Sequence, residues 1–356
     1  MYRSAKDIAG RIHDLYFPAS HKVSWSFDGF IGWRPVRYFS YGRWALFEAL
    51  QIAGIGKNDK ILLPAFICRD ILSAINTIGA IPVYYQVDKH MQLADAPDSL
   101  IPAKAILMVN YFGFPQELSS FQHYCRKTGA VLIEDNAHGF LSRDKEGQAL
   151  GTRGDLGIFS LRKTLTLPNG AAMVINIPDK GYMIKRQIEP EQKRVSASFA
   201  AKRFLQNTRQ LVNLRTIRIM TSAIRTVRKM TTGHGIAPSA PDVEFKLPGN
   251  AAPCMKLQYS LDHLDVEQEI TRRRELYRLL DAVMRQNGFE PVFATLSAQV
   301  VPYAYPFFVS ENQIDRAKKV LSMINLECFS WPELPEDVVP IAPDWFRNIR
   351  IISFSW

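Results

Sequence analysis

The chain has 356 residues, enough for one large and one small domain, and no apolar run in it approaches the length of a membrane span. Hydrophobic residues make up 47% and charged residues 22% of the sequence, as in ordinary soluble globular proteins. The net charge of +10 favours anionic partners, whether phosphorylated small molecules, nucleic acid or an acidic membrane surface.

Helix and strand patterns alternate between residues 40 and 176. Apolar residues at helical spacing predict helices over 43–55, 69–80 and 117–130. Short apolar runs predict strands over 60–64, 81–88, 104–110, 131–135, 156–161 and 171–176. This alternation is typical of an α/β fold with a mainly parallel sheet flanked by helices. Ligands bind such sheets at the carboxyl ends of strands, and Asn110 and Asp135 stand at two of these ends.

Residues 183–230 are unusually basic. They hold twelve lysines and arginines against two acids, and apolar residues recur at helical spacing at 214, 217, 220, 224 and 227. The pattern predicts an amphipathic helix. Its apolar stripe packs on the protein, or its basic face lies on an anionic surface such as a membrane. A loop rich in Gly and Pro follows at 231–250.

A change of pattern from about residue 289 predicts a second, smaller domain. A charged helix is expected over 264–288, and strand–helix–strand signals follow it to the end of the chain. We therefore expect a large α/β domain over 1–250, which includes the basic segment and the loop (183–250). A small C-terminal α+β domain is expected over 251–356.

The four cysteines are scattered, and no spacing of histidines and cysteines suggests a metal site. The N-terminus lacks the apolar core and small-residue cleavage site of a secretory signal. The sequence therefore predicts reduced thiols, no metal and a cytoplasmic location.

Three short stretches carry residues suited to chemistry. "YGRWAL" puts Gly42 just before a helix, whose free N–H groups and dipole favour a phosphate. "IEDNAH" puts Asp135 at a strand end, followed by His138. "FSLRK" puts Ser160 and Lys163 on one turn. Taken singly, each has a plainer interpretation: an ordinary helix start, a capping acid and a solvated lysine.

In this order along an α/β chain, the three stretches resemble the DegT/DnrJ/EryC1/StrS sugar-aminotransferase family of fold-type-I enzymes, which use pyridoxal 5'-phosphate (PLP). "VLIEDNAHG" is the most specific match, to the family pattern IEDxAHA, and "GDLGIFSLRK" resembles GDxxxFSFxxxK. "DKILLPAF" and "IGAIPVYYQVD" resemble two strands of the family. The resemblance covers residues 40–176 and, more faintly, 250–330. It implies the PLP-dependent transferase fold type I.

The resemblance also implies roles for single residues. Lys163 would bond covalently to the cofactor aldehyde, and Asp135 would pair with the pyridine nitrogen. His138 would lie beside the ring hydroxyl, and Ser160 would hold the phosphate. The other cofactor contacts would come from Gly42, from the backbone of Arg43 and Trp44, from Phe66, and from Asn250, which corresponds to an asparagine of the partner subunit. The resemblance thus implies a homodimer.

The chemistry of these residue types agrees with the implied roles. The cofactor withdraws electrons only while its ring nitrogen stays protonated, and a carboxylate such as Asp135 favours that proton. A lysine must lose its proton to attack the aldehyde, and burial beside cationic groups such as Arg162 lowers its pKa.

The sequence departs from the family pattern in two places near the site. Lys163 stands three positions after Ser160, where the family's lysine usually stands five positions after the serine. The aromatic ring that stacks on the cofactor in the family falls at Cys68, and Phe66 is the candidate to replace it.

The leading interpretation is a PLP-dependent aminotransferase that moves an amino group, expected to come from glutamate, to a keto sugar nucleotide or similar keto substrate. A dehydratase-like sugar-modifying PLP enzyme is an alternative. Related dehydratases carry histidine in place of the lysine, whereas Lys163 is present here. A third interpretation is a membrane-surface or nucleic-acid binder that works through residues 183–230. The leading interpretation expects no nucleic-acid partner and leaves peripheral membrane contact open.

Overall fold

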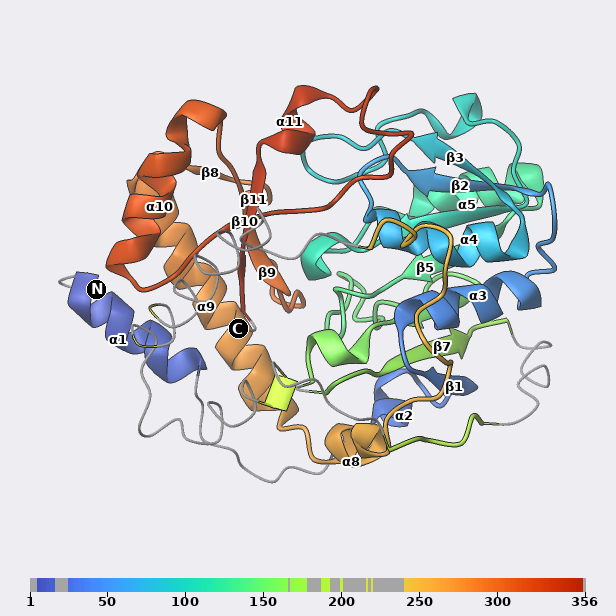
Figure 1. Ribbon diagram of the computed structural model, residues 1–356, viewed down its shortest axis with the longest axis horizontal. Coiled ribbons are helices and arrows are strands. Elements are labelled where there is room, and N and C mark those ends of the chain that lie inside the picture. Colours follow the sequence, from blue (N-terminus) through green and yellow to red (C-terminus); the bar gives the residue numbers. More distant parts are fainter. Residues whose placement is uncertain are drawn as a thin grey trace.

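A seven-stranded sheet forms the centre of the larger part of the molecule, and a four-stranded sheet lies in the smaller part (Figure 1). The computed structural model describes residues 5–16, 25–165, 167–177, 187–192, 199–200, 216, 219 and 240–354. Most of the predicted basic segment, 183–230, therefore lies outside the described residues. Within the described ranges, no helix combines the length and the hydropathy needed to cross a membrane.

The larger sheet is mainly parallel. Its strands are β1 Val36–Phe39, β2 Lys60–Pro64, β3 Ile81–Tyr85, β4 Ala105–Val109, β5 Val131–Asp135, β6 Leu156–Phe159 and β7 Ala171–Ile175. They stand in the order β1-β7-β6-β5-β4-β2-β3. The five strands β3, β2, β4, β5 and β6 run parallel, while β7 is antiparallel to both of its neighbours. The predicted fold class is confirmed.

The register of the central strands brings their carboxyl ends together. Val109 on β4 pairs with Asp135 on β5, and Asp135 pairs with Ile158 on β6. Residues that follow these three strands therefore gather at one edge of the sheet, where ligands bind in parallel sheets.

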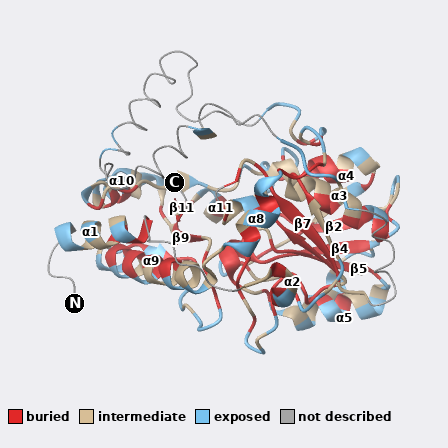
Figure 2. Cartoon of the chain, turned by 90° about the horizontal axis from the view of Figure 1, so that it is seen from below, coloured by how far each residue is buried: buried red, intermediate tan, exposed pale blue. Residues whose placement is uncertain are grey.

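Helices cover both faces of the larger sheet, as Figure 2 shows. Helices α3 (Gly42–Ile52) and α4 (Leu72–Ile78) lie on one face and α5 (Leu118–Thr128) on the other. All five residues of β4 are buried, which explains its continuous apolar sequence. Helices α4 and α5 end at Gly79 and Gly129, whose φ values of 77° and 74° favour glycine.

The smaller part of the molecule holds an antiparallel sheet. Its strands are β8 Glu290–Pro291, β9 Ala304–Phe308, β10 Phe329–Ser330 and β11 Ile349–Ser353, in the order β10-β11-β9-β8. The other helices of the described residues are α1 Ala5–Tyr16, α2 Phe27–Phe30, α8 Lys256–Asp262, α9 Val266–Gln286, α10 Ile314–Met323 and α11 Asp344–Arg347.

Helix α1 lies beside α9 although the two are far apart in sequence (Figure 1). The Arg11 guanidinium donates two hydrogen bonds to the Glu275 carboxylate, both at 2.7 Å. The Tyr16 hydroxyl donates to the carbonyl of Ser353 on β11. An N-terminal helix thus covers C-terminal elements, while the division of the chain into domains at residues 250 and 251 stays a prediction.

Candidate functional site

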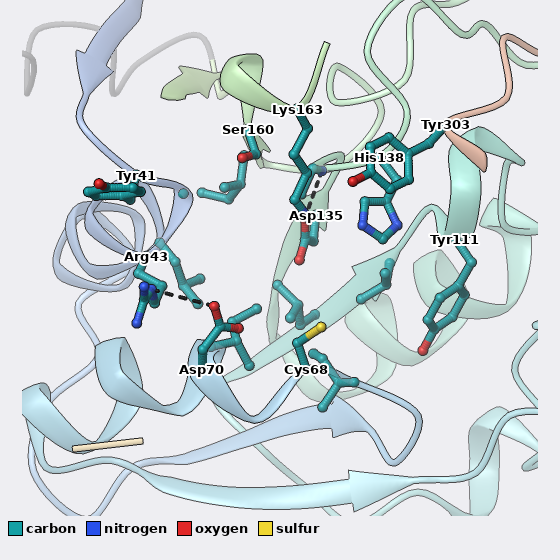
Figure 3. A pocket seen from close by; sticks show the side chains of 18 of the residues that line it. Tyr41, Arg43, Cys68, Asp70, Tyr111, Asp135, His138, Ser160, Lys163 and Tyr303 are labelled. Carbon is teal, nitrogen blue, oxygen red and sulfur yellow. Dashed lines mark hydrogen bonds and ion pairs between the residues drawn. The ribbon is translucent and has the colours of Figure 1, made fainter. Parts of the chain in front are cut away.

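A cavity of about 270 Å³ opens at the carboxyl ends of β4, β5 and β6 (Figure 3). Six of the residues predicted from the sequence line it. They are Gly42, Arg43, Asp135, His138, Ser160 and Lys163. The fold therefore brings together the three stretches "YGRWAL", "IEDNAH" and "FSLRK", which are separated by up to about a third of the chain.

Asp135 is the last residue of β5 and faces the cavity. Its Oδ1 accepts a hydrogen bond from the backbone N–H of Ala137 at 2.9 Å. Burial raises the pKa of the carboxyl, against the opposing effects of the Ala137 N–H and the charge of Lys163. A buried carboxylate of this kind is stabilised when a cation enters the cavity, such as a protonated ring nitrogen.

Lys163 ends a single helical turn, Leu161–Lys163, that follows β6. Its backbone N–H donates to the carbonyl of Ser160 at 3.0 Å, which closes the turn. Its side chain points into the cavity toward Asp135, and its Nζ lies 5.7 Å from the centre of the Tyr303 ring (Figure 3). The short spacing between Ser160 and Lys163 therefore still places both residues on the cavity wall.

His138 lies between two aromatic rings. Its ring centroid is 4.4 Å from that of Tyr303, with an angle of 5° between the planes, and 5.6 Å from that of Phe112, with an angle of 24°. Burial drives the pKa of His138 well below its usual value, and the charge of Lys163 lowers it further. The imidazole is therefore neutral at pH 7. Because Nδ1 accepts from the Phe112 backbone N–H at 3.4 Å, Nε2 carries the proton.

The first turn of α3 forms another wall of the cavity. Tyr41 precedes the helix and provides no side-chain cap, so the N-terminal end of the helix is open toward Ser160. A Cβ atom at Gly42 would lie 3.9 Å from the Cβ of Ser160, which shows how close the two residues are. The Arg43 Nε lies 3.7 Å from Asp70 Oδ2. Helix N–H groups, a hydroxyl and a guanidinium together suit a phosphate.

Comparison with known proteins finds a family that part of the chain resembles. Residues 19–191 match the DegT/DnrJ/EryC1/StrS aminotransferase family. The match covers a little under half of the chain, so this stretch is similar to that family. Because the cavity holds a buried carboxylate, a lysine and an anion-binding helix end, its residues fit the family's cofactor, PLP, as predicted from the sequence.

Curated relatives match only part of the chain. The dTDP-4-dehydro-2,3,6-trideoxy-D-glucose 4-aminotransferase of Saccharopolyspora spinosa is 32% identical over 157 residues, which are 42% of this chain and 40% of that protein. The GDP-perosamine synthase of Escherichia coli O157:H7 is 31% identical over 143 residues, 38% of this chain and 39% of that protein. The chain thus aligns with about 40% of the length of these relatives.

Solved structures resemble almost the whole chain in fold. The aminotransferase TlmJ from Streptoalloteichus hindustanus has a TM-score of 0.61 at 19% identity, over 92% of this chain and 82% of that chain. Helicobacter pylori PseC, an aminotransferase involved in the biosynthesis of pseudoaminic acid, has a TM-score of 0.62 at 15% identity, over 99% and 91%. At these identities the likeness shows the fold, which extends beyond the residues of the family match.

Three of the contacts predicted from the sequence do not line the cavity. The Phe66 side chain is fully buried and packs edge-on against Phe346, with centroids 4.8 Å apart. The Asn250 side chain donates to Glu191 Oε2 at 2.6 Å. The Trp44 backbone N–H, predicted to face the phosphate, donates instead to the Tyr41 carbonyl at 3.0 Å.

Sequence reasoning missed several aromatic residues of the cavity wall, and Tyr303 and Trp331 are two of them. Both come from the C-terminal part of the chain, far from the stretch that holds Lys163. They stand in the aromatic runs "PYAYPFF" and "FSWPELP", which are equally typical of a core. The sequence pattern does not distinguish these two cavity-lining rings from the neighbouring aromatic residues that are buried in the core.

A buried polar network lies next to Asp135. Glu134 is fully buried, and its Oε1 accepts from the Arg153 Nε at 2.8 Å. The Arg153 Nη2 donates to Asn110 Oδ1 at 2.8 Å. The backbone N–H of Asn110 donates to the carbonyl of Asp135 at 3.0 Å. The network therefore fixes the ends of β4 and β5, and with them the position of Asp135.

Proposed function

We propose that the protein is a PLP-dependent aminotransferase that moves an amino group, from glutamate, to a keto group on a sugar nucleotide. One observation carries the proposal: Asp135, His138 and Lys163 line a single cavity at the carboxyl end of the sheet. The names of the relatives support the substrate class, since they include an aminotransferase for a dTDP-linked keto sugar and a GDP-perosamine synthase.

Each residue has a distinct role in this proposal. Bound PLP supplies an electron-withdrawing ring next to the carbon that gains or loses the proton. Asp135 would keep a proton at the ring nitrogen, and the neutral His138 would donate from Nε2 to the ring hydroxyl. Lys163 would hold the cofactor at its Nζ and would take up and return the proton during the transfer. Ser160 and the first turn of α3 bind the phosphate.

The working unit proposed here is a cytoplasmic homodimer. The position of Asn250, which contacts Glu191 of its own chain and does not reach this cavity, leaves open a contact with the cavity of a second copy. Light scattering tests this part. A purely monomeric protein with full activity on dilution would contradict it.

The alternatives from the sequence gain less support. Two GDP-4-keto-6-deoxymannose-3-dehydratase structures share the fold with a TM-score of 0.58, but at 12% and 13% identity this likeness concerns the fold alone. The presence of Lys163 in the cavity favours amino transfer. The membrane or nucleic-acid binder would work through residues 183–230, most of which lie outside the described residues.

The test of the proposed function is cofactor attachment at Lys163. Purified protein should absorb near the visible band of lysine-bound PLP, and borohydride reduction should leave the cofactor on the peptide that contains Lys163. Lys163→Ala should lose this attachment, whereas Lys104→Ala, a change outside the cavity, should keep it. A screen of keto sugar nucleotides with glutamate then identifies the substrate. Reduced cofactor on another lysine, or none at all, would sink the assignment.

A further inference from the structure

One wall of the cavity is formed by Trp331, which comes from the loop after β10. Its ring centroid lies 5.1 Å from that of His138 and 4.8 Å from that of Phe112. The Trp331 ring also packs edge-on against Phe66, at 5.5 Å. A molecule that contacts His138 in this cavity therefore comes within reach of the Trp331 indole.

Next to this wall, one arginine is bound by three carboxylates, which we call the Arg69 cluster. Its members are Arg69, Glu244, Glu333 and Glu336. The Arg69 Nε donates to Glu244 Oε1 at 2.9 Å, the Nη2 to Glu336 Oε1 at 2.7 Å and the Nη1 to Glu333 Oε1 at 3.4 Å. The cluster joins three segments that are distant in sequence.

Backbone hydrogen bonds tie the same segments together. The Arg69 N–H donates to the Glu333 carbonyl at 2.8 Å, and the Glu336 N–H donates to Glu244 Oε1 at 3.2 Å. Arg69 stands between Cys68 and Asp70, and both of these neighbours line the cavity. Since Trp331 precedes Glu333 by two residues, the cluster holds the Trp331 segment against the loop that follows β2.

The members of the Arg69 cluster differ in solvent exposure. The side chain of Arg69 is 13% exposed and that of Glu244 is 6% exposed, so this pair is shielded from water and salt. The side chain of Glu336 is 71% exposed, and its ion pair contributes little. The Arg69–Glu244 pair is therefore the part of the cluster that fixes the segment.

We propose that Trp331 is a residue that contacts the molecule bound in the cavity and that Arg69 is the residue that positions it. The proposal rests on the proposed function, because PLP is taken as the molecule bound. An indole ring offers a flat apolar surface to another ring. An aromatic contact of this kind changes an affinity by about two- to tenfold.

The first experiment measures the dissociation constant of PLP with the cofactor-free protein, by absorbance titration. Trp331→Ala should weaken binding by about fivefold, and Trp331→Phe, which keeps a ring, should restore most of it. Trp33→Phe is the matched control, since Trp33 is 76% exposed and does not line the cavity. This control should bind PLP as the wild type does.

The second experiment tests Arg69 by a double-mutant cycle. Arg69→Met should weaken PLP binding by a factor similar to that of Trp331→Ala, and it should add little in the Trp331→Ala background. Arg285→Met breaks an exposed ion pair with Asp281 and is the matched control. If Arg69→Met fails to fold, Arg69→Lys and Glu244→Gln keep the side-chain sizes and weaken the same contacts.

The outcomes separate the two proposals. If the wild-type protein binds no PLP, the proposed function fails. If the wild type binds PLP and Trp331→Ala binds it equally well, the role of Trp331 is wrong while the proposed function stands. If Arg69→Met weakens binding by the same factor with and without Trp331, Arg69 acts on its own and the positioning role is wrong. A loss that Trp331→Phe restores, together with the non-additive cycle, supports both roles.

Discussion

The α/β part of the molecule and its C-terminal part contribute to the cavity in different ways. The α/β part supplies the polar groups, Asp135, His138 and Lys163, on the ends of strands and the turns that follow them. The C-terminal part supplies two aromatic rings, Tyr303 and Trp331, from loops. Reactive groups thus stand on a rigid sheet, while the walls around them come from a second structural unit.

Each part also contains a buried acid–arginine cluster near its contribution to the cavity. Glu134 and Arg153 have side chains that are 0% and 1% exposed and lie beside Asp135. In the C-terminal part, Glu269 on α9 pairs with Arg272 and Arg273, at 2.7 Å and 2.5 Å. The Arg273 Nη1 donates to the carbonyl of Tyr303 at 3.4 Å. The Glu134–Arg153 cluster is the more deeply buried, so we expect the stability of the protein to depend more strongly on it than on the Glu269 cluster.

The largest effect is expected from Arg153→Met. The change leaves the Glu134 carboxylate buried without its charged partner, which costs about 3–5 kcal/mol in the free energy of unfolding. The double variant Glu134→Gln, Arg153→Met removes both charges and should recover part of the loss. Urea denaturation measures both. A single variant within about 1 kcal/mol of the wild type would show that the pair does not fix the strand ends.

Removing the charge of Asp135 should affect the reaction rather than the fold. Asp135→Asn should slow the half-reaction with the amino donor by about a hundredfold or more, because a neutral amide does not hold a proton on the ring nitrogen. Asp98→Asn changes an exposed carboxylate and is the control. Stopped-flow absorbance follows the step. Rates within twofold of the control would count against the assigned role.

The sequence predicts some strands of the α/β part correctly and misses another. The strands over 60–64 and 131–135 were predicted to the residue, because each is a short apolar run with a clear end, at Pro64 in the first and at two acids in the second. Strand β1 was missed because it is an edge strand with only Phe39 buried, so it lacks a clear pattern. Its pairing with β7 is visible only in the fold.

Site residues, too, are predicted where a local sequence pattern marks them and missed where only the fold places them. Asp135 and Lys163 lie in short motifs next to strand ends, so the sequence predicts them even with the shorter spacing between Ser160 and Lys163. Phe66 was predicted to face the cofactor, yet it packs among the rings of Trp331 and Phe346 in the core. Whether the side chain of a loop residue faces the cavity or the core depends on residues that are far away in sequence. The Arg69 cluster arises from such long-range contacts.

A smaller, pH-dependent effect is expected from Glu269 in the C-terminal part. Burial alone would raise its pKa, but the charges and hydrogen bonds of Arg272 and Arg273 overcome this and lower the pKa to about 2. The ionised carboxylate therefore adds about 2–3 kcal/mol of stability above the unfolded-state pKa of about 4.5, and this is lost as the pH falls toward 2.

Denaturation of the wild type and of Glu269→Gln at several pH values tests this contribution. The difference between their free energies of unfolding should be largest near pH 6 and should shrink as the pH falls below about 4.5. A difference that stays constant with pH would contradict the lowered pKa. The matched variant Glu275→Gln, which breaks the half-exposed pair with Arg11, should show a much weaker dependence on pH.

The smallest effect is expected where the two parts touch, at the contact of Tyr303 with His138. Because burial is the leading cause of the low pKa of His138, Tyr303→Ala should admit water to the imidazole and raise that pKa toward its usual value. Tyr303→Phe keeps the stacked ring and should leave the pKa of His138 unchanged. NMR titration of the imidazole protons, assigned with His138→Gln, measures both variants. If Tyr303→Ala titrates as the wild type does, the α/β part alone sets the protonation of His138, and the C-terminal ring is a wall without influence on the chemistry.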